Sequence, residues 1–137
     1  MNTRFDALGV APDICDALAA EGKTEAFPIQ ALTIADALAG RDVCGKAKTG
    51  SGKTLAFGVP VLQTVKAAEP GKPRAIILVP TRELATQVRE ELAPLGAPRD
   101  VTVAAIYGGA DIEKQIKKIK AGVEVIAATP GRMIDLI

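Results

Sequence analysis

The residues best suited to chemistry form one glycine-rich stretch, Ala47-Lys-Thr-Gly-Ser-Gly-Lys-Thr54. Gly50 and Gly52 permit backbone conformations in which successive N–H groups point inward, and a helix beginning near Lys53 adds its positive end. In such a loop Lys53 would reach the β- and γ-phosphates of a nucleotide, and the Thr54 hydroxyl would bind Mg²⁺. The stretch therefore predicts a nucleoside triphosphate site made of Lys48, Thr49, Gly50, Ser51, Gly52, Lys53 and Thr54.

The same stretch also has interpretations other than a phosphate-binding loop. The general P-loop pattern begins with glycine, where this chain has Ala47, and a glycine turn before a helix needs no ligand. Its position between a predicted strand and a predicted helix favours the phosphate loop. A P-loop alone indicates only nucleotide binding, because kinases, GTPases and motor proteins share it.

The elements that must position the loop alternate between helices and strands. Apolar spacing, caps, prolines and glycines predict helices at 11–22, 28–38, 53–65, 81–95, 111–120 and 131–137. Pro60 is expected to bend or locally disrupt the third of these helices. Short apolar runs predict strands at 42–47, 74–79, 101–107 and 123–128. This alternation indicates an α/β fold with a mostly parallel sheet flanked by helices.

In such sheets, ligands bind outside the carboxyl ends of the strands. That rule selects three loops, 47–52, 80–82 and 129–132, which hold the polar, glycine and proline residues that the strands lack. The loops after several strands are therefore expected to form one functional edge.

Composition excludes several other functions. The 137 residues carry a net charge of +1, so a nucleic-acid site must be local rather than a property of the whole surface. The absence of histidine removes serine–histidine triads and histidine-containing metal sites. Two cysteines without a CxxC pattern, no run of about 18 apolar residues and no secretory signal favour a cytoplasmic protein without a membrane partner.

Several short segments, taken in order, point to one family. They are Phe5, Pro28-Ile-Gln30, Ala47–Thr54, Pro80-Thr-Arg-Glu-Leu-Ala85, Gly108-Gly109 and Thr129-Pro-Gly-Arg132. Over nearly its whole length the chain resembles the N-terminal RecA-like domain of DEAD-box ATP-dependent RNA helicases, in which alanine is usual at the first P-loop position. The resemblance implies a RecA-like fold, ATP and Mg²⁺ as cofactors, and RNA unwinding or remodelling as the activity.

The adenine-binding element of that family matches only in part. The resemblance assigns Phe5 and Gln30 to this element, but Lys23 replaces its usual aromatic residue and Ala26 its usual proline. The primary amide of Gln30 carries the donor and the acceptor that an adenine edge requires. Without the resemblance, Gln30 is interpreted as a surface amide in the first turn of a helix.

The resemblance also implies an RNA site that contacts the backbone without reading bases. Its residues would be Pro80, Thr81, Arg82, Gly108, Gly109, Thr129, Pro130, Gly131 and Arg132. Arginines and backbone N–H groups bind phosphate in this way. A separate basic cluster, Lys114, Lys117, Lys118 and Lys120, is interpreted as the solvated face of a helix.

Hydrolysis also requires a carboxylate on Mg²⁺, and no predicted strand ends in one. The family's Asp-Glu-Ala-Asp and Ser-Ala-Thr motifs and the arginine finger of a second RecA-like domain are absent. The chain is therefore interpreted as a truncated domain spanning 1–137, with a Q-motif region at 1–40 and a P-loop core at 41–137. By itself it is expected to hydrolyse almost no ATP.

Truncation would expose a sheet edge, so the chain is expected to form homo-oligomers, which a clean monomer in light scattering would contradict. Two alternative functions remain open. One is another P-loop NTPase, such as a DNA helicase or a nucleotide kinase. The other is a non-enzymatic module that binds nucleotide or RNA, or dimerises.

Overall fold

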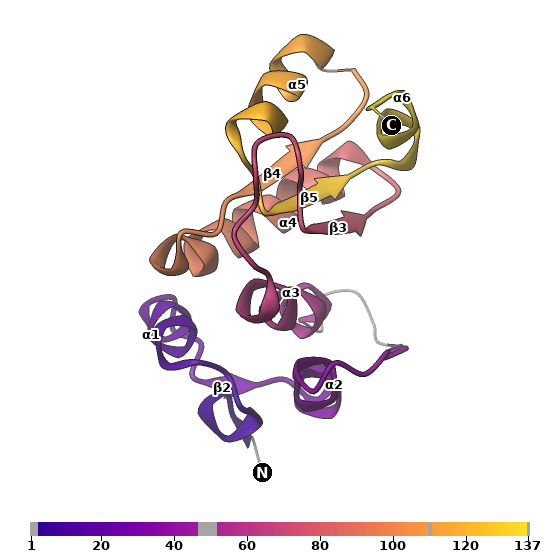
Figure 1. Cartoon of the computed structure of the whole chain (residues 1–137). Coiled ribbons are helices and arrows are strands. Elements are labelled where there is room, and N and C mark those ends of the chain that lie inside the picture. The colour runs from indigo at the N-terminus through magenta and orange to yellow at the C-terminus, as the bar shows by residue number, and fades with distance from the viewer. Residues whose placement is uncertain (1–2, 47–51, 110, 137) are drawn as a thin grey trace. The chain divides into compact units, whose positions relative to one another are not determined.

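The computed structural model describes residues 3–46, 52–109 and 111–136, which fall into two compact units, Met1–Thr64 and Val65–Ile137. The first unit contains β1 (Thr3–Arg4), a 3-10 turn (Asp6–Leu8), α1 (Pro12–Ala20), β2 (Glu25–Ala26), α2 (Pro28–Leu38) and α3 (Lys53–Thr64). The second contains β3 (Ala75–Leu78), α4 (Arg82–Gly96), a 3-10 turn (Ala97–Arg99), β4 (Val103–Ile106), α5 (Ile112–Ala121), β5 (Val125–Ala128) and α6 (Pro130–Leu136) (Figure 1).

The first unit is mainly helical. Pro12 and Pro28 stand at the first positions of α1 and α2, where a missing N–H costs no helical hydrogen bond. Helices α2 and α3 pack against each other, and the short strands β1 and β2 pair antiparallel. The side chains of Ile14, Leu18, Ile34, Val59 and Leu62 are completely buried and form the apolar interior of this unit.

Two expectations for the first unit are wrong. Residues 42–46 form no strand, because no described segment pairs with them and their side chains are exposed; Ala47 lies outside the described residues. The local disruption expected at Pro60 does not occur, because α3 runs unbroken from Lys53 to Thr64. The proline removes one N–H donor, but the helix continues around it, and the Thr64 hydroxyl donates to the Pro60 carbonyl at 2.8 Å.

The second unit is a three-stranded parallel sheet in the order β3-β5-β4. Val125 of the central strand is in register with Ala75 on one side and Val103 on the other. The chain moves from β3 to β4 and then back to β5, so right-handed crossovers place α4 and α5 on opposite faces, as Figure 1 shows. This arrangement confirms the predicted α/β fold with a parallel sheet flanked by helices.

The central strands supply the core of this unit. Strands β4 and β5 are buried along their whole length, as their apolar sequences predict for strands covered on both faces. One cluster consists of Ala104, Ile106, Val123, Ile126 and Ala128, against which Ile119, Met133 and Leu136 pack. The edge strand β3 differs, because Ile76 and Leu78 remain more than half exposed.

Local capping signals place the helices at the functional edge. Thr81 accepts a hydrogen bond from the Leu84 amide at 3.2 Å, and Asp111 accepts one from the Glu113 amide at 2.9 Å. Thr81, whose residue type favours the N-cap position, therefore caps α4. The spacing of Leu84, Val88, Leu92 and Leu95 predicts one buried apolar stripe along α4. This prediction is wrong at Leu84, which is exposed, whereas Ala85 beside it is buried. Among the described residues, no helix has the length and apolarity needed to cross a membrane.

Candidate nucleotide and RNA sites

Gln30 connects the start of α2 to the start of α3. Its side chain is only 2% exposed, so the interpretation as a surface amide is wrong. Its Oε1 accepts from the Phe27 amide at 2.8 Å, which caps α2, and its Nε2 donates to the Gly52 carbonyl at 3.0 Å. The proposed adenine-binding residue therefore lies in direct contact with the end of the predicted phosphate loop.

Gly52 occupies a position that only glycine fits. Its φ is +85°, in the left-handed region, and a Cβ there would collide with the Gln30 amide nitrogen and lie 2.7 Å from Phe27 Cδ2. Its carbonyl accepts from both Gln30 and the Ala56 amide. The close packing explains why the predicted loop needs a glycine directly before Lys53.

The remaining loop residues divide into two groups. Lys53 and Thr54 open α3, where Lys53 is exposed and Thr54 is half-buried. This position places their side chains at the positive end of a twelve-residue helix, which favours a phosphate group. The other predicted residues, Ala47, Lys48, Thr49, Gly50 and Ser51, lie outside the described residues.

Phe5 has a different environment from the one that adenine stacking requires. It is only 3% exposed, and its carbonyl accepts from the Leu8 and Val10 amides. Direct stacking on a base would require the ring to leave the interior of the first unit. Lys23 and Ala26, which replace the usual aromatic residue and proline of the adenine-binding element, have different environments. Lys23 is exposed, whereas Ala26 is buried in β2.

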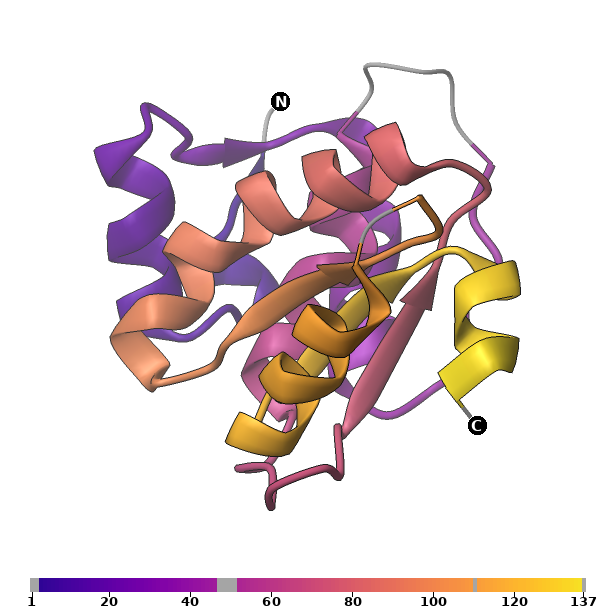
Figure 2. The same cartoon turned by 90° about the horizontal axis from the view of Figure 1, so that it is seen from above.

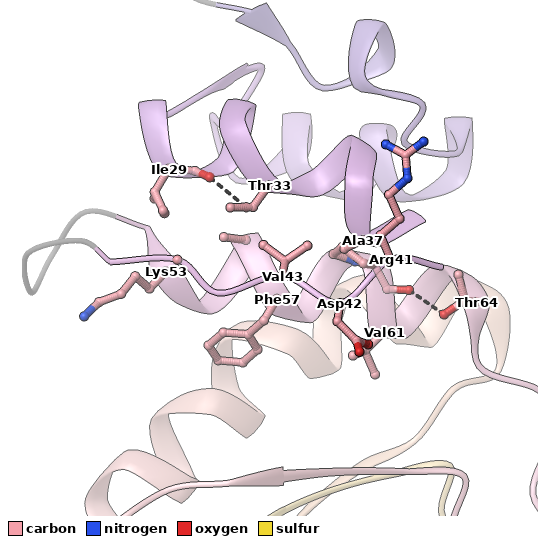
Figure 3. A pocket seen from close by; sticks show the side chains of 13 residues that line it. Ile29, Thr33, Ala37, Arg41, Asp42, Val43, Lys53, Phe57, Val61 and Thr64 are labelled. Atoms are coloured by element: carbon pink, nitrogen blue, oxygen red, sulfur yellow. Dashed lines mark hydrogen bonds between the residues drawn. The ribbon is translucent and has the colours of Figure 1, made fainter. Parts of the chain in front are cut away.

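A cavity of about 450 Å³ lies in the first unit beside α2, residues 41–45 and α3. Its lining is largely apolar and includes Ile29, Val43 and Phe57, with Arg41 and Asp42 among the polar residues. Figure 3 shows Lys53 at one end, with its ammonium group pointing away from Val43. The predicted phosphate-binding Lys53 therefore lines one end of a largely apolar cavity.

The predicted RNA residues all belong to the second unit and follow its three strands. Because β3, β5 and β4 are parallel neighbours, the loops after them meet at one edge of the sheet (Figure 2). At this edge the Arg82 Nη1 atom is 3.4 Å from the position that a Cβ on Gly109 would occupy, and Gly109 has a φ of +87°. Most of these residues are exposed, namely Pro80, Thr81, Arg82, Gly108, Gly109, Pro130 and Gly131.

Arg132 is held by neighbouring side chains. Its side chain is 12% exposed, its Nη1 donates to Gln115 Oε1 at 3.0 Å, and its Nε is 3.6 Å from an Asp135 carboxylate oxygen. The backbone of Thr129, one turn earlier, donates to the Ile106 carbonyl at 3.0 Å and so ties the motif to β4. The arginine is therefore oriented in the protein without a bound ligand.

Gln115 is a buried polar residue beside the candidate RNA site that sequence reasoning missed. It is 5% exposed, and its Nε2 donates to the Tyr107 carbonyl at 2.9 Å. A signal was available, because position 115 lies three residues after Ile112 and four before Ile119, on the apolar stripe of the predicted helix. The lysines of α5 are exposed as expected, namely Lys114, Lys117, Lys118 and Lys120.

The described residues fit ATP better than Mg²⁺. Gly52, Lys53 and the α3 N-terminus provide close approach and positive charge for phosphates. For Mg²⁺ the start of α3 supplies the Thr54 hydroxyl, and the described part of the chain holds no group of three or more His, Cys, Asp or Glu residues that could bind a metal ion. Magnesium in nucleotide sites uses phosphate oxygens and one or two carboxylates, so this donor set is insufficient by itself.

The parallel sheet flanked by helices, the left-handed glycine directly before α3 and the three loops at one sheet edge are typical of a RecA-like P-loop domain. A family profile described as DEAD/DEAH box helicase matches residues 27–137. The chain belongs to this family, which confirms the assignment drawn from its motifs.

Relatives and solved structures agree with this assignment. The chain is 46% identical over 134 residues to a DEAD-box ATP-dependent RNA helicase CshA of Streptococcus pneumoniae, covering 98% of this chain and 25% of the relative. It is 47% identical over 135 residues to a CshA helicase of Geobacillus kaustophilus, covering 98% and 29%. The chain thus spans about a quarter of the length of these curated relatives.

Two solved structures share the fold. The RNA helicase Prp28 from Chaetomium thermophilum bound to ADP matches with a TM-score of 0.88 and 39% identity, over 98% of this chain and 34% of that one. A DEAD box protein from Methanococcus jannaschii matches with a TM-score of 0.88 and 37% identity, over 96% and 36%. Both confirm the RecA-like architecture.

Proposed function

We propose that the chain is the ATP- and RNA-binding portion of an ATP-dependent RNA helicase. The observation that carries the proposal is the hydrogen bond from Gln30 to the Gly52 carbonyl, which joins the adenine-recognition residue to the phosphate loop. Family membership and the named activity of the similar proteins support it. We propose that 1–137 is part of one RecA-like domain, with 1–40 as its Q-motif region and 41–137 as its P-loop core.

For nucleotide binding we propose a division of labour. The Gln30 amide has two N–H groups and two acceptor positions, and its bonds to Phe27 and Gly52 use one of each. The second N–H and the second acceptor would pair with an adenine edge once Gln30, which is 2% exposed, becomes accessible to the nucleotide. Lys53 would neutralise phosphate charge, and Thr54 would contribute one oxygen to Mg²⁺. When bound, Mg²⁺ would neutralise charge on the phosphates.

For RNA binding we propose backbone contacts at the sheet edge described above. Arg82 and Arg132 would contact phosphates, while Gly108, Gly109 and Gly131 allow close approach of the RNA backbone. Such contacts do not distinguish one base from another, so binding would not depend on the RNA sequence. In the helicase, ATP would close this domain and a second RecA-like domain on one RNA strand and so distort the duplex.

Hydrolysis, we propose, requires groups outside these 137 residues. The described strands β3, β4 and β5 are followed by Val79, Tyr107 and Thr129, so none delivers a carboxylate to the site. A magnesium carboxylate, a group that positions water and an arginine finger would all have to be supplied. The 137-residue chain should therefore bind ATP weakly and turn it over at a rate close to background.

Fluorescence titration with a labelled adenine nucleotide and a steady-state phosphate assay test this proposal. We expect Lys53→Ala to weaken nucleotide binding about tenfold, which corresponds to roughly 1.4 kcal/mol. Lys46→Ala, at an exposed lysine of the preceding segment, is the matched control and should bind as the wild type does. Robust turnover that is lost in Lys53→Ala would contradict the proposed inactivity, and absence of nucleotide binding would contradict the proposed function.

A cytoplasmic location is also proposed, since both cysteines are free thiols. Burial raises the pKa of the Cys15 thiol, Asp6 and Asp16 raise it further, and the thiol donates to the Val10 carbonyl at 3.4 Å. A raised pKa means less thiolate at pH 8, so an alkylating reagent should modify the exposed Cys44 at least about tenfold faster.

Mass spectrometry of peptides after timed alkylation measures both rates. In Cys44→Ser the remaining Cys15 should react faster as the pH rises, by about tenfold per unit until its pKa is reached. Equal rates at the two cysteines at pH 8 would contradict the prediction.

Self-association of the chain remains a proposal. Strand β3 is an edge of the described sheet, and its Ile76 and Leu78 side chains are 53% and 61% exposed. An edge strand with exposed apolar side chains favours pairing with a second copy. The other proposed partners are RNA, bound without sequence specificity, and a second RecA-like domain.

A further inference from the structure

Gln115 of α5 is a polar side chain buried within the second unit. It is 5% exposed, whereas the lysines on either side of it in the sequence reach solvent. Burying an amide is unfavourable unless its groups are hydrogen-bonded, at a cost of about 1–3 kcal/mol for each unpaired group. Here both ends of the amide are bonded, Nε2 to the Tyr107 carbonyl and Oε1 to Arg132 Nη1.

The two partners of Gln115 belong to different loops of the sheet edge. Tyr107 directly precedes Gly108 and Gly109, which follow β4, whereas Arg132 belongs to α6, which follows β5. One amide therefore links the glycine pair to the arginine across two neighbouring strands. The backbone hydrogen bond from Thr129 to the Ile106 carbonyl joins the same two strand ends, and the Gln115 side chain adds a second link farther along both loops.

The link also limits the freedom of the guanidinium group. Gln115 holds Nη1 from one direction, and Asp135 lies 3.6 Å from Nε on the same helix. An arginine that is already oriented loses less conformational entropy when it binds a phosphate. The guanidinium group is thereby held in a fixed direction.

We propose that Gln115 is a positioning residue for RNA binding. Its amide holds the Gly108–Gly109 backbone and the Arg132 guanidinium in a fixed position relative to each other. It acts through these groups and makes no contact with RNA itself. The inference rests on the proposed RNA-binding function of this edge. It assigns to α5 a role in RNA binding that depends on its buried Gln115 and not on its exposed lysines.

A series of substitutions at position 115 separates the two bonds. Gln115→Met has similar volume and removes both, whereas Gln115→Glu still accepts from Arg132 but cannot donate to the Tyr107 carbonyl. Gln87→Met makes the same chemical change at an exposed site of α4 and serves as the control. Thermal unfolding followed by circular dichroism checks that each variant is folded.

Affinity for a single-stranded oligouridylate, measured by fluorescence anisotropy at several salt concentrations, is the readout. Gln115→Met should weaken binding about tenfold and reduce the slope of log affinity against log salt by about 0.7, the value for one lost phosphate contact on a single strand. Gln115→Glu should keep the wild-type slope with an intermediate affinity. A loss of stability alone lowers the active fraction without changing this slope, so the slope reports positioning.

An Arg132→Met background completes the test. There Gln115→Met should have little further effect on the slope, because both substitutions remove the same contact. If Gln115→Met fails to fold, the wild-type slope and intermediate affinity of Gln115→Glu decide the question in its place. Wild-type affinity and slope in both position-115 variants would overturn the inference while leaving RNA binding intact. Absence of RNA binding by the wild-type chain would overturn the proposed function, and the inference with it.

Discussion

Gly52→Ala is expected to lower the affinity for ATP about a hundredfold, equivalent to roughly 2.8 kcal/mol. An alanine at a φ of +85° is strained by about 1–2 kcal/mol. Its Cβ would also collide with the Gln30 amide nitrogen and lie 2.7 Å from Phe27 Cδ2. The Gln30–Gly52 hydrogen bond would then be lost, at a cost of about 1 kcal/mol. Both costs fall on the backbone that must hold the phosphates.

Gly40→Ala is the matched control for this substitution. Gly40 has a φ of +82°, but a Cβ there meets no atom within 4 Å. The control therefore carries the backbone strain without the collision. It should lose about 1–2 kcal/mol of stability and bind ATP as the wild type does. Titration with a labelled nucleotide and urea unfolding of both variants measure these effects. Tight ATP binding by Gly52→Ala would show that Gln30 and the loop are not coupled.

Glu124 is a buried carboxylate directly before β5, at the end of the parallel sheet where its strands begin. It is 8% exposed, and each carboxylate oxygen accepts one backbone amide, Thr102 at 2.8 Å and Ala68 at 3.0 Å. Its own carbonyl accepts from the Arg74 and Ala75 amides at 2.9 and 3.0 Å. One residue thereby joins the segments that lead into β3, β4 and β5.

Glu124→Ala should reduce the free energy of unfolding by about 3–4 kcal/mol, because it removes two charge-assisted hydrogen bonds and leaves two amides without their acceptor. Glu124→Gln should cost about half as much, since the new amide can accept at only one end. Urea unfolding followed by circular dichroism measures both. Loss of a bond of this kind ranks among the larger effects of single substitutions.

Glu90→Ala, at an exposed glutamate of α4, is the control for removal of a carboxylate and should change stability by less than about 0.5 kcal/mol. If Glu124→Ala and Glu90→Ala unfold at the same urea concentration, the two amides find other partners and the role assigned to Glu124 is wrong.

Much of the fold was predictable because its signals are local. Pro28 begins α2, and Thr81 and Asp111 cap α4 and α5, each through contacts within four residues along the chain. The apolar runs of β3, β4 and β5 likewise identified the strands of the parallel sheet. Only β4 and β5 are buried along their whole length, because β3 lies at the edge of the described sheet and exposes Ile76 and Leu78. The motif residues of the candidate sites were also found from sequence, through their order and spacing.

The features that sequence reasoning missed depend on partners distant in the chain. Residues 42–46 were predicted to be a strand, yet a strand exists only where another segment completes its hydrogen-bond ladder. The same holds for the buried amide of Gln30, whose partner Gly52 lies 22 residues away, and for Gln115, whose partner Arg132 lies 17 residues away.

The sequence by itself determined which residues are suited to bind phosphate and which segments form helices and strands, because residue type and periodicity act over a few positions. The tertiary structure decided which polar groups are buried and paired, because desolvation depends on what packs around a side chain. For this reason Lys53 and Arg82 were identified from their motifs. The links that Gln30, Gln115 and Glu124 make became evident only once the chain was folded.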